Sequence, residues 1–218
     1  MEKQARGKYI QIEGMDGSGK STVIAALSEY LAGIGVEHIV VQEPGSTPLG
    51  AHLRNIVKDA DYPIDDVAEA MLFAAARRQV WVNTVLPALE RGVTVLTDRG
   101  LLSSYAYQGG GRGCYEQVLD LASITFGGRE EIYDLTIYLD IDAETALQRS
   151  RLRGMLDRIE QTGLAFFAEA LEYYHDIFKR TEIKEYLDQV AKIDATQSKE
   201  QVAHEAVNAL RSFLTREE

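Results

Sequence analysis

The sequence predicts an α/β fold in which a five-stranded parallel sheet is flanked by helices. Short apolar and β-branched runs alternate with stretches of helical spacing along the chain. The apolar runs show little alternation of apolar and polar residues, which is typical of strands buried on both faces. Acidic residues end three of these runs, at Asp98, Asp140 and Asp194. Ligands of open α/β sheets bind at that carboxyl edge.

The first two strands and the helix between them have clear boundaries. A β-branched and aromatic run over 8–13 predicts the first strand. Apolar residues at helical spacing predict a helix over about 20–31 that stops at Gly33. A second strand at 38–42 ends before Pro44, which with the glycine after it favours a turn.

Two helices precede the third strand. The first covers about 49–58, and a longer helical pattern covers about 65–89. Pro87 is expected to kink or end the longer helix, because proline lacks an N–H and its ring clashes with the preceding turn. The third strand is predicted at 93–98.

The rest of the chain repeats the alternation of strands and helices. Two further strands are expected at 135–140 and 190–194. Helical spacing predicts helices near 143–153, 164–187 and 198–214.

Composition limits the classes of function. The chain has 218 residues, of which 45% are hydrophobic and 26% charged, as expected of a single globular domain over 1–218. Its net charge of -11 argues against binding to a nucleic acid polymer or an anionic membrane. A long apolar run and a signal-peptide-like start are both missing from the sequence. Cys114 is the one cysteine, which excludes an intrachain disulfide and fits a reducing cytoplasm.

Residues 14–22 match the pattern G-x-x-x-x-G-K-[ST] between a predicted strand and a predicted helix. Glycines let backbone N–H groups surround an anion, and the helix N-terminus adds partial positive charge. Lys20 is expected in a solvent-facing cradle, where it reaches the β- and γ-phosphates, and the Ser21 hydroxyl is expected to bind Mg²⁺. The pattern indicates a nucleoside triphosphate site made of Gly14, Met15, Asp16, Gly17, Ser18, Gly19, Lys20, Ser21 and Thr22.

Asp98 ends the third predicted strand, and Arg99 follows it. An aspartate there suits the organisation of a phosphate-bound metal ion. It could equally cap the next helix, and both interpretations stay open. The neighbouring arginine suggests that a second anion binds close by.

Four further segments accompany the phosphate-binding loop: Gln42-Glu-Pro-Gly45, Phe73-Ala-Ala-Ala-Arg77, Asp98-Arg-x-x-x-Ser-Ser-x-Ala-Tyr-Gln-Gly109 and Leu156-Asp-Arg-Ile-Glu160. In order and content the sequence resembles the bacterial thymidylate kinases (dTMP kinases), a P-loop nucleoside monophosphate kinase family. The resemblance covers nearly the whole chain. It implies transfer of a phosphoryl group from ATP to dTMP with Mg²⁺, giving dTDP for dTTP biosynthesis, and a homodimer.

The resemblance also implies an acceptor pocket for the base and sugar. Phe73 would stack on thymine, and Arg77 would donate to a pyrimidine carbonyl. Gln108, with Ser104 nearby, would face N3 and its carbonyl neighbour. Tyr107 would pack against C2′ and disfavour a ribose hydroxyl. Each of these residues could instead have an ordinary structural role, as a buried Phe73 on a helix often does.

The acceptor phosphate would be held by arginines. The resemblance implies that Arg54 and Arg99 bind it, since guanidinium groups match phosphate oxygens. Asp16 would accept a hydrogen bond from the 3′-OH or organise that phosphate. Lys20, Asp16, Arg99 and Arg153 are the predicted catalytic residues.

A lid over about 149–160 is expected to close over ATP. The family places a catalytic arginine either in the phosphate-binding loop or in the lid, and here the loop has Gly17. Arg153 is therefore the first candidate for spreading transition-state charge, with Arg149 and Arg151 as further candidates and Arg158 as support.

The sequence departs from the family pattern at two positions, and two other functions are possible for it. Gln42 stands where the family commonly has arginine, and Ser46 where glycine often follows. One rival function is a deoxynucleoside kinase acting on thymidine, for which Glu43 could serve as the base. The other is a P-loop nucleotide switch that performs no kinase reaction.

Overall fold

A five-stranded parallel sheet forms the centre of the molecule. The computed structural model describes residues 6–61, 63–129, 132–154, 156–176, 179, 184 and 186–216, apart from the side chain of Arg153. The strands are β1 (Tyr9–Gly14), β2 (His38–Gln42), β3 (Thr94–Asp98), β4 (Tyr133–Asp140) and β5 (Leu187–Asp194). Their order in the sheet is β2-β3-β1-β4-β5, with all neighbours parallel. The predicted fold class is confirmed.

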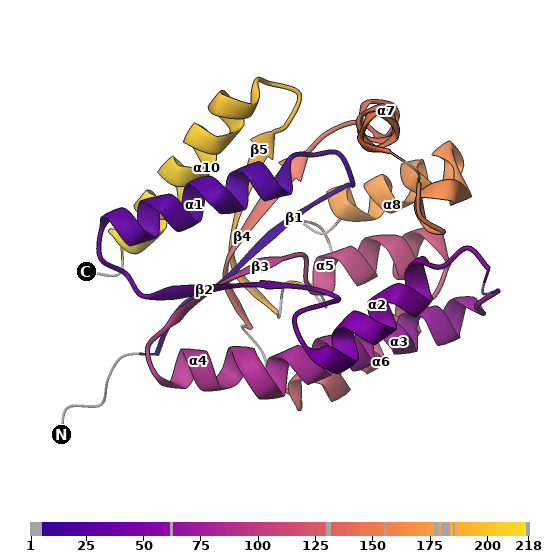
Figure 1. The fold of residues 1–218 in the computed structure, drawn as a ribbon, viewed down its shortest axis with the longest axis horizontal. Helices are drawn as coiled ribbons and strands as arrows, with labels where there is room; N and C mark the ends of the chain where they lie inside the picture. Colours follow the sequence, from indigo (N-terminus) through magenta and orange to yellow (C-terminus); the bar gives the residue numbers. More distant parts are fainter. Residues whose placement is uncertain are drawn as a thin grey trace.

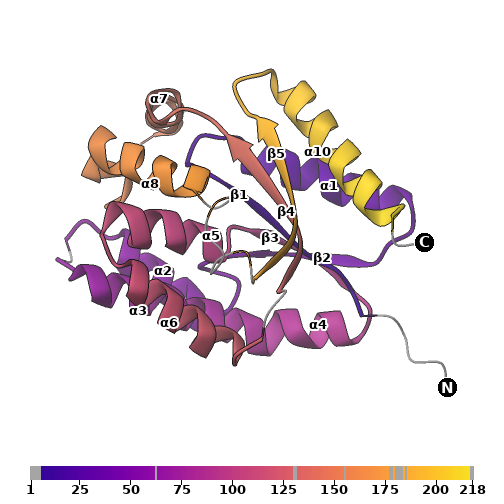
Figure 2. The same ribbon diagram turned by 180° about the vertical axis from the view of Figure 1, so that it is seen from behind.

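Helices cover both faces of this sheet. They are α1 (Lys20–Gly33), α2 (Pro48–Lys58), α3 (Asp66–Val80), α4 (Leu86–Glu90), α5 (Leu101–Ser104), α6 (Tyr115–Phe126), α7 (Ala143–Arg153), α8 (Leu164–Asp176) and α10 (Lys199–Leu214). Figures 1 and 2 show α1 and α10 on one face, and α3 to α6 on the other. Among the described residues, every helix is too short or too polar to cross a membrane.

The position of β1 determines where a ligand can bind. Ile12 of β1 pairs with Asp98 of β3 on one side and with Ile137 of β4 on the other. The chain thus extends the sheet first toward β2 and then toward β5, so that the strand order reverses at β1. Such a reversal opens a crevice at the carboxyl edge, which is the usual ligand site of open α/β sheets.

The predicted helix over 65–89 is one helical path with a wide turn in it. After α3, the π-helical segment η1 (Trp81–Val85) leads into α4. Pro87 lies in the first turn of α4, directly after the wide segment. A wider turn relieves the clash of the proline ring with the preceding carbonyl and accommodates the missing N–H. The helical path therefore continues past Pro87 to Glu90.

Three helical segments between β3 and β4 were not predicted. They are α5, the π-helical segment η2 (Tyr105–Gly111) and α6. Two glycines of η2 are required by contact with α8, since a Cβ would lie 2.5 Å from the Tyr173 ring at Gly110 and 2.3 Å from the Phe166 ring at Gly111. In α6, Val118, Ala122 and Phe126 are buried at a spacing of four residues, which is a helical signal.

Strand and helix ends differ from the prediction near the C-terminus. The predicted helix over 164–187 is too long, because α8 ends at Asp176 and β5 already begins at Leu187. β4 also begins earlier than predicted, at Tyr133. Residues 177, 178, 180–183 and 185 of the predicted helix lie outside the described part of the chain.

Aromatic side chains fill the core between β1, β4, α6 and η1. The Phe126 ring meets Trp81 edge-on at 5.3 Å and Tyr133 at 6.1 Å between ring centroids. Tyr9 stacks in a tilted arrangement on Tyr133 at 4.7 Å. These contacts attach the unpredicted α6 to the sheet through one large side chain.

Truncation of Phe126 tests that attachment. Phe126→Ala should lower the free energy of unfolding by about 3–5 kcal/mol, because it leaves a cavity among aromatic rings. Urea unfolding measures the loss. Asp120→Ala, at an exposed position of the same helix, should change stability by less than about 0.5 kcal/mol. Equal losses in the two variants would contradict the packing described.

Candidate active site

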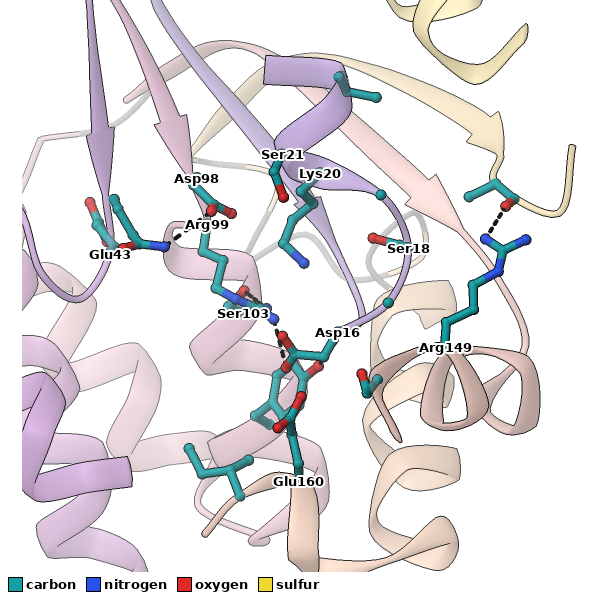
Figure 3. Close-up of a pocket in the computed structure, with 18 of the residues that line it drawn as sticks. Asp16, Ser18, Lys20, Ser21, Glu43, Asp98, Arg99, Ser103, Arg149 and Glu160 are labelled. Carbon is teal, nitrogen blue, oxygen red and sulfur yellow. Dashed lines mark hydrogen bonds and ion pairs between the residues drawn. The ribbon is translucent and has the colours of Figure 1, made fainter. Parts of the chain in front are cut away.

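A cavity of about 890 Å³ opens at the carboxyl edge of the sheet. Its wall comes from the loop after β1, from α2 and α3, from the segment after β3, and from α7 and the β5–α10 connection. Figure 3 shows part of this wall. The predicted acceptor residues all line it: Asp16, Arg54, Phe73, Arg77, Arg99, Ser104, Tyr107 and Gln108. Of the predicted triphosphate-binding loop, Gly17 to Thr22 line the same cavity.

The loop between β1 and α1 presents an open helix N-terminus. Gly19 precedes α1 with a left-handed φ of 99°, and its position provides no side-chain cap. In contrast, α2, α3, α7 and α10 are capped by Thr47, Asp65, Asp142 and Ser198. The first turn of α1 also carries no acidic residue. Its backbone N–H groups and partial positive charge are thus available to an anion.

The exposure of Lys20 in the structure differs from the prediction. The expectation of a solvent-facing side chain is wrong, because Lys20 is 7% exposed. Its ammonium donates to the carbonyl oxygens of Gly14 (2.9 Å) and Met15 (3.0 Å), both beneath the loop. Burial, helped by the nearby Arg99, lowers the pKa of Lys20 to about 8. A bound phosphate would supply the negative charge that this buried cation lacks.

Asp16 and Arg99 form an ion pair on the cavity wall. The guanidinium lies 2.8 Å from the carboxylate and also donates to the Ser103 hydroxyl at 2.9 Å (Figure 3). Burial would raise the pKa of Asp16, but Arg99 and Lys20 together hold it well below its ordinary value. Arg99 has a φ of 70°, a left-handed conformation that is uncommon for a residue with a side chain. Such strained backbone is often found at functional sites.

Arg77 is buried behind the acceptor end of the cavity. Its Nε donates to Glu43 at 2.7 Å, and its Nη2 donates to the Gly100 carbonyl (2.8 Å) and the Ser104 hydroxyl (3.0 Å). The other Glu43 oxygen accepts from Tyr9 at 3.1 Å. Burial raises the pKa of Glu43, although Arg77 acts in the opposite direction. These bonds fix the plane of the Arg77 guanidinium before any ligand binds.

Helix α7 approaches the phosphate-binding loop too closely to allow a side chain at Gly17. A Cβ there would lie 2.4 Å from the Ala146 carbonyl oxygen of α7, and φ is 87°. An arginine in the loop is therefore excluded by sterics as well as by sequence. Positive charge from this direction has to come from α7 and the residues after it.

The three lid arginines differ in their positions. Arg149 donates to the Ala195 carbonyl at 2.9 Å and points toward the β5–α10 connection, away from Asp16 (Figure 3). Arg151 is exposed, and it is not part of the cavity wall among the described residues. Arg153 ends α7, and its side chain lies outside the described part of the structure. Arg158 instead bonds to the Val57 carbonyl at 2.9 Å and to Glu69.

Asp98 and Ser21 line the cavity on the same side as Lys20 (Figure 3). Asp98 does not cap the next helix, since α5 begins after Gly100 without a side-chain cap. Its Oδ2 accepts from the Gln42 amide at 3.2 Å, so this departure from the family pattern contacts the predicted metal residue. Its Oδ1 is buried with no hydrogen-bond partner in the described part of the chain. An orphaned carboxylate oxygen beside an exposed hydroxyl fits a hard cation such as Mg²⁺.

The predicted site residues did not include two buried carboxylates that lie next to the cavity wall. Glu13, at the end of β1, accepts from the backbone of Gly100 and Ser103 and from the hydroxyls of Ser103 and Tyr174, at 2.7–3.1 Å. Glu69, in α3, accepts from Gln108 at 2.9 Å. Glu69 carries a usable sequence signal, because it precedes Phe73 by four residues and so shares its helix face.

Titration of Lys20 should be visible in the affinity for a triphosphate. Lys20 is protonated in the free protein below about pH 8, and a bound anion raises its pKa. The affinity for ATP should therefore be constant up to that pH and fall above it, by up to about tenfold per pH unit.

Calorimetric titrations from about pH 7 to about pH 9.5 would measure this effect. Lys20→Met should bind ATP weakly and without the decline. A flat profile in the unmodified protein, or the same slope in both proteins, would disprove the assignment to Lys20.

Comparisons with known proteins identify the family of this chain. A family model described as thymidylate kinase matches residues 12–206. A thymidylate kinase of Colwellia psychrerythraea is 41% identical over 212 residues, covering 96% of both chains. One from Pseudoalteromonas translucida is 43% identical over 95% of this chain and 97% of its own. One from Glaesserella parasuis is 42% identical over 97% and 99%. The chain thus belongs to the thymidylate kinase family.

Proposed function

We propose that this protein transfers the γ-phosphoryl group of ATP to dTMP, which yields ADP and dTDP for dTTP biosynthesis. The strongest support for this proposal is one observation. A single cavity contains an uncapped helix N-terminus with its lysine and, facing it, a second set of cations around Arg99 and Arg77. Two anions can therefore be held in the same cavity, as transfer between two nucleotides requires.

The reaction needs charge neutralisation and alignment more than proton transfer. The nucleophile is a phosphate oxygen of dTMP that is already anionic at neutral pH, so no general base is needed. Lys20 and the N-terminus of α1 would hold the donor phosphates. Arg54 and Arg99 would hold the acceptor phosphate, with Asp16 fixing the orientation of Arg99. Holding two polyanions in line in this way removes most of the barrier that their repulsion creates.

The acceptor base would bind at the far end of the cavity. Phe73 is partly buried and lines the wall, which suits stacking on a flat ring. Arg77 and Gln108 supply polar groups on the same wall. The Tyr107 hydroxyl accepts from the Asp16 N–H at 3.3 Å, so its ring lies between the loop and the acceptor pocket. That position supports contact with the deoxyribose.

Mg²⁺ fits the donor end of the cavity. Ser21 and Asp98 would hold it together with water and phosphate oxygens, since this ion takes few protein ligands. When bound, the ion would neutralise charge on the donor phosphates. The described residues contain no cluster of three or more His, Cys, Asp or Glu that could hold a metal ion by itself. This agrees with an ion that arrives with its nucleotide.

A thymidine kinase is a weaker alternative. It would require a carboxylate base near a neutral hydroxyl, and Glu43 is the candidate. Both Glu43 oxygens already accept hydrogen bonds, from Arg77 and Tyr9. A pair of arginines for the acceptor phosphate would also have no ligand in that reaction. A nucleotide switch would need no second pocket.

We also propose that the whole chain forms one catalytic domain with a lid near 149–160, and that it acts as a homodimer in the cytoplasm. Exposed apolar side chains on three neighbouring helices support the dimer. Ile56 of α2, Met71 of α3 and Ile124 of α6 are 39%, 55% and 70% exposed. Figures 1 and 2 show these helices side by side. A second copy covering this face would remove the apolar surface from water.

The direct test is the acceptor panel. With ATP and Mg²⁺, the purified protein should phosphorylate dTMP with the highest kcat/KM among dTMP, dGMP, AMP and thymidine. Lys20→Met should abolish transfer to every acceptor while circular dichroism stays unchanged. Preference for thymidine would favour the deoxynucleoside kinase, and preference for a purine nucleotide would refute the thymine pocket.

The lid arginine is tested by substitution. Arg153→Ala should lower kcat about 10³-fold with little change in KM for dTMP, as expected of a charge that acts on the transferring group. Gln148→Ala, at an exposed position of the same helix, serves as the control. If kcat persists in Arg153→Ala but is lost in Arg149→Ala or Arg151→Ala, another lid arginine performs this role.

A further inference from the structure

Glu69 is a fully buried carboxylate next to the proposed base pocket. It lies on α3 four residues before Phe73 and eight before Arg77, so the three side chains share one face of the helix. Its side chain is 0% exposed. A carboxylate removed from water to this extent is stable only if its oxygens are fully hydrogen-bonded.

Three side chains donate hydrogen bonds to the Glu69 carboxylate. Arg112 donates to both oxygens, at 3.3 Å and 3.2 Å. Arg158, from the lid region, donates to Oε2. The Gln108 amide nitrogen donates to Oε1 at 2.9 Å. The carboxylate therefore faces two guanidinium groups and one amide nitrogen, and in all of these contacts it accepts the hydrogen bond.

This contact determines which end of the Gln108 amide faces the ligand. An amide has a donating NH₂ and an accepting carbonyl. Because Glu69 takes the NH₂, the carbonyl is left as the polar group that Gln108 offers to the cavity that it lines. The reverse orientation would place a carbonyl oxygen against a carboxylate oxygen, which is repulsive. The polarity of the amide is therefore set by a residue behind it.

We infer that Glu69 is a positioning residue that fixes Gln108 as a hydrogen-bond acceptor and thereby restricts the acceptor to pyrimidine nucleotides with an N–H at N3. Thymine and uracil carry that N–H, whereas N3 of cytosine is itself an acceptor. The inference rests on the proposed function. It assigns selection against cytosine to a residue that makes no contact with the base.

The test compares dTMP with dCMP in Glu69→Gln, which keeps the shape of the side chain. A glutamine can turn either end toward Gln108, so the Gln108 amide becomes able to reverse. The ratio of kcat/KM for dTMP to that for dCMP should fall about tenfold or more. Some preference for dTMP should persist, because Arg77 still opposes the cytosine amino group. KM for ATP should stay unchanged.

Asp66→Asn is the matched control. Asp66 lies on the same helix and contacts Arg112 at 3.4 Å, and among the described contacts it makes no hydrogen bond to Gln108. Its substitution neutralises one carboxylate beside the same arginine and should leave the dTMP to dCMP ratio as it is. A purely structural role of Glu69 would lower kcat/KM for both nucleotides equally and leave the ratio intact, which would overturn the inference.

A second measurement uses the unmodified protein, in case Glu69→Gln does not fold. The side-chain amide signals of Gln108 can be assigned in an NMR spectrum by their loss in Gln108→Leu. Addition of dTMP should move them little, because the NH₂ remains on Glu69. A large shift would mean that the NH₂ binds the base, and the inference would be wrong. If the unmodified protein does not phosphorylate dTMP, the proposed function itself fails instead.

Discussion

The carboxylate of Glu13 joins the two halves of the site. Glu13 is the second-last residue of β1, directly before the phosphate-binding loop, and it accepts hydrogen bonds from Gly100 and Ser103 after β3. Arg99, which directly precedes Gly100, has its left-handed backbone conformation next to these hydrogen bonds. Loss of this carboxylate would leave buried N–H and hydroxyl groups without acceptors, at about 1–3 kcal/mol each. The position of the phosphate-binding loop relative to the segment after β3 thus depends on one buried acid.

An acidic protein of net charge -11 can bind two polyanions because carboxylates hold its arginines in fixed orientations before the ligands bind. Glu43 fixes Arg77, and Asp16 fixes Arg99. Each carboxylate weakens the attraction of its arginine for phosphate. It also offsets the desolvation penalty of the buried guanidinium, and it reduces the side-chain entropy that would be lost on ligand binding. Lys20 is the contrasting case. Its described hydrogen bonds go to the carbonyl oxygens of Gly14 and Met15, and among the described contacts it has no ion pair with a carboxylate.

The sequence predicted the parts of the structure that local spacing determines. The five strands, the phosphate-binding loop and the open start of α1 follow from patterns within about ten residues. Helix α6 was not predicted, although Val118, Ala122 and Phe126 recur at helical spacing. Burial of Lys20 and the hydrogen bonds of Glu13 could not be predicted. They depend on segments that are distant in sequence and meet only at the sheet edge.

Residues 149–160 contact two different sides of the cavity. Arg149 on α7 bonds to the β5–α10 connection, beside the proposed ATP site. The segment after α7 instead contacts the acceptor side, where Asp157 pairs with Lys58 at 2.6 Å and Arg158 bonds to Glu69. The segment after α7 therefore bonds to the same carboxylate that accepts from the Gln108 amide. Glu69 thus holds both the Gln108 amide and the segment after α7 in place, so the positions of these two parts of the cavity depend on the same buried acid.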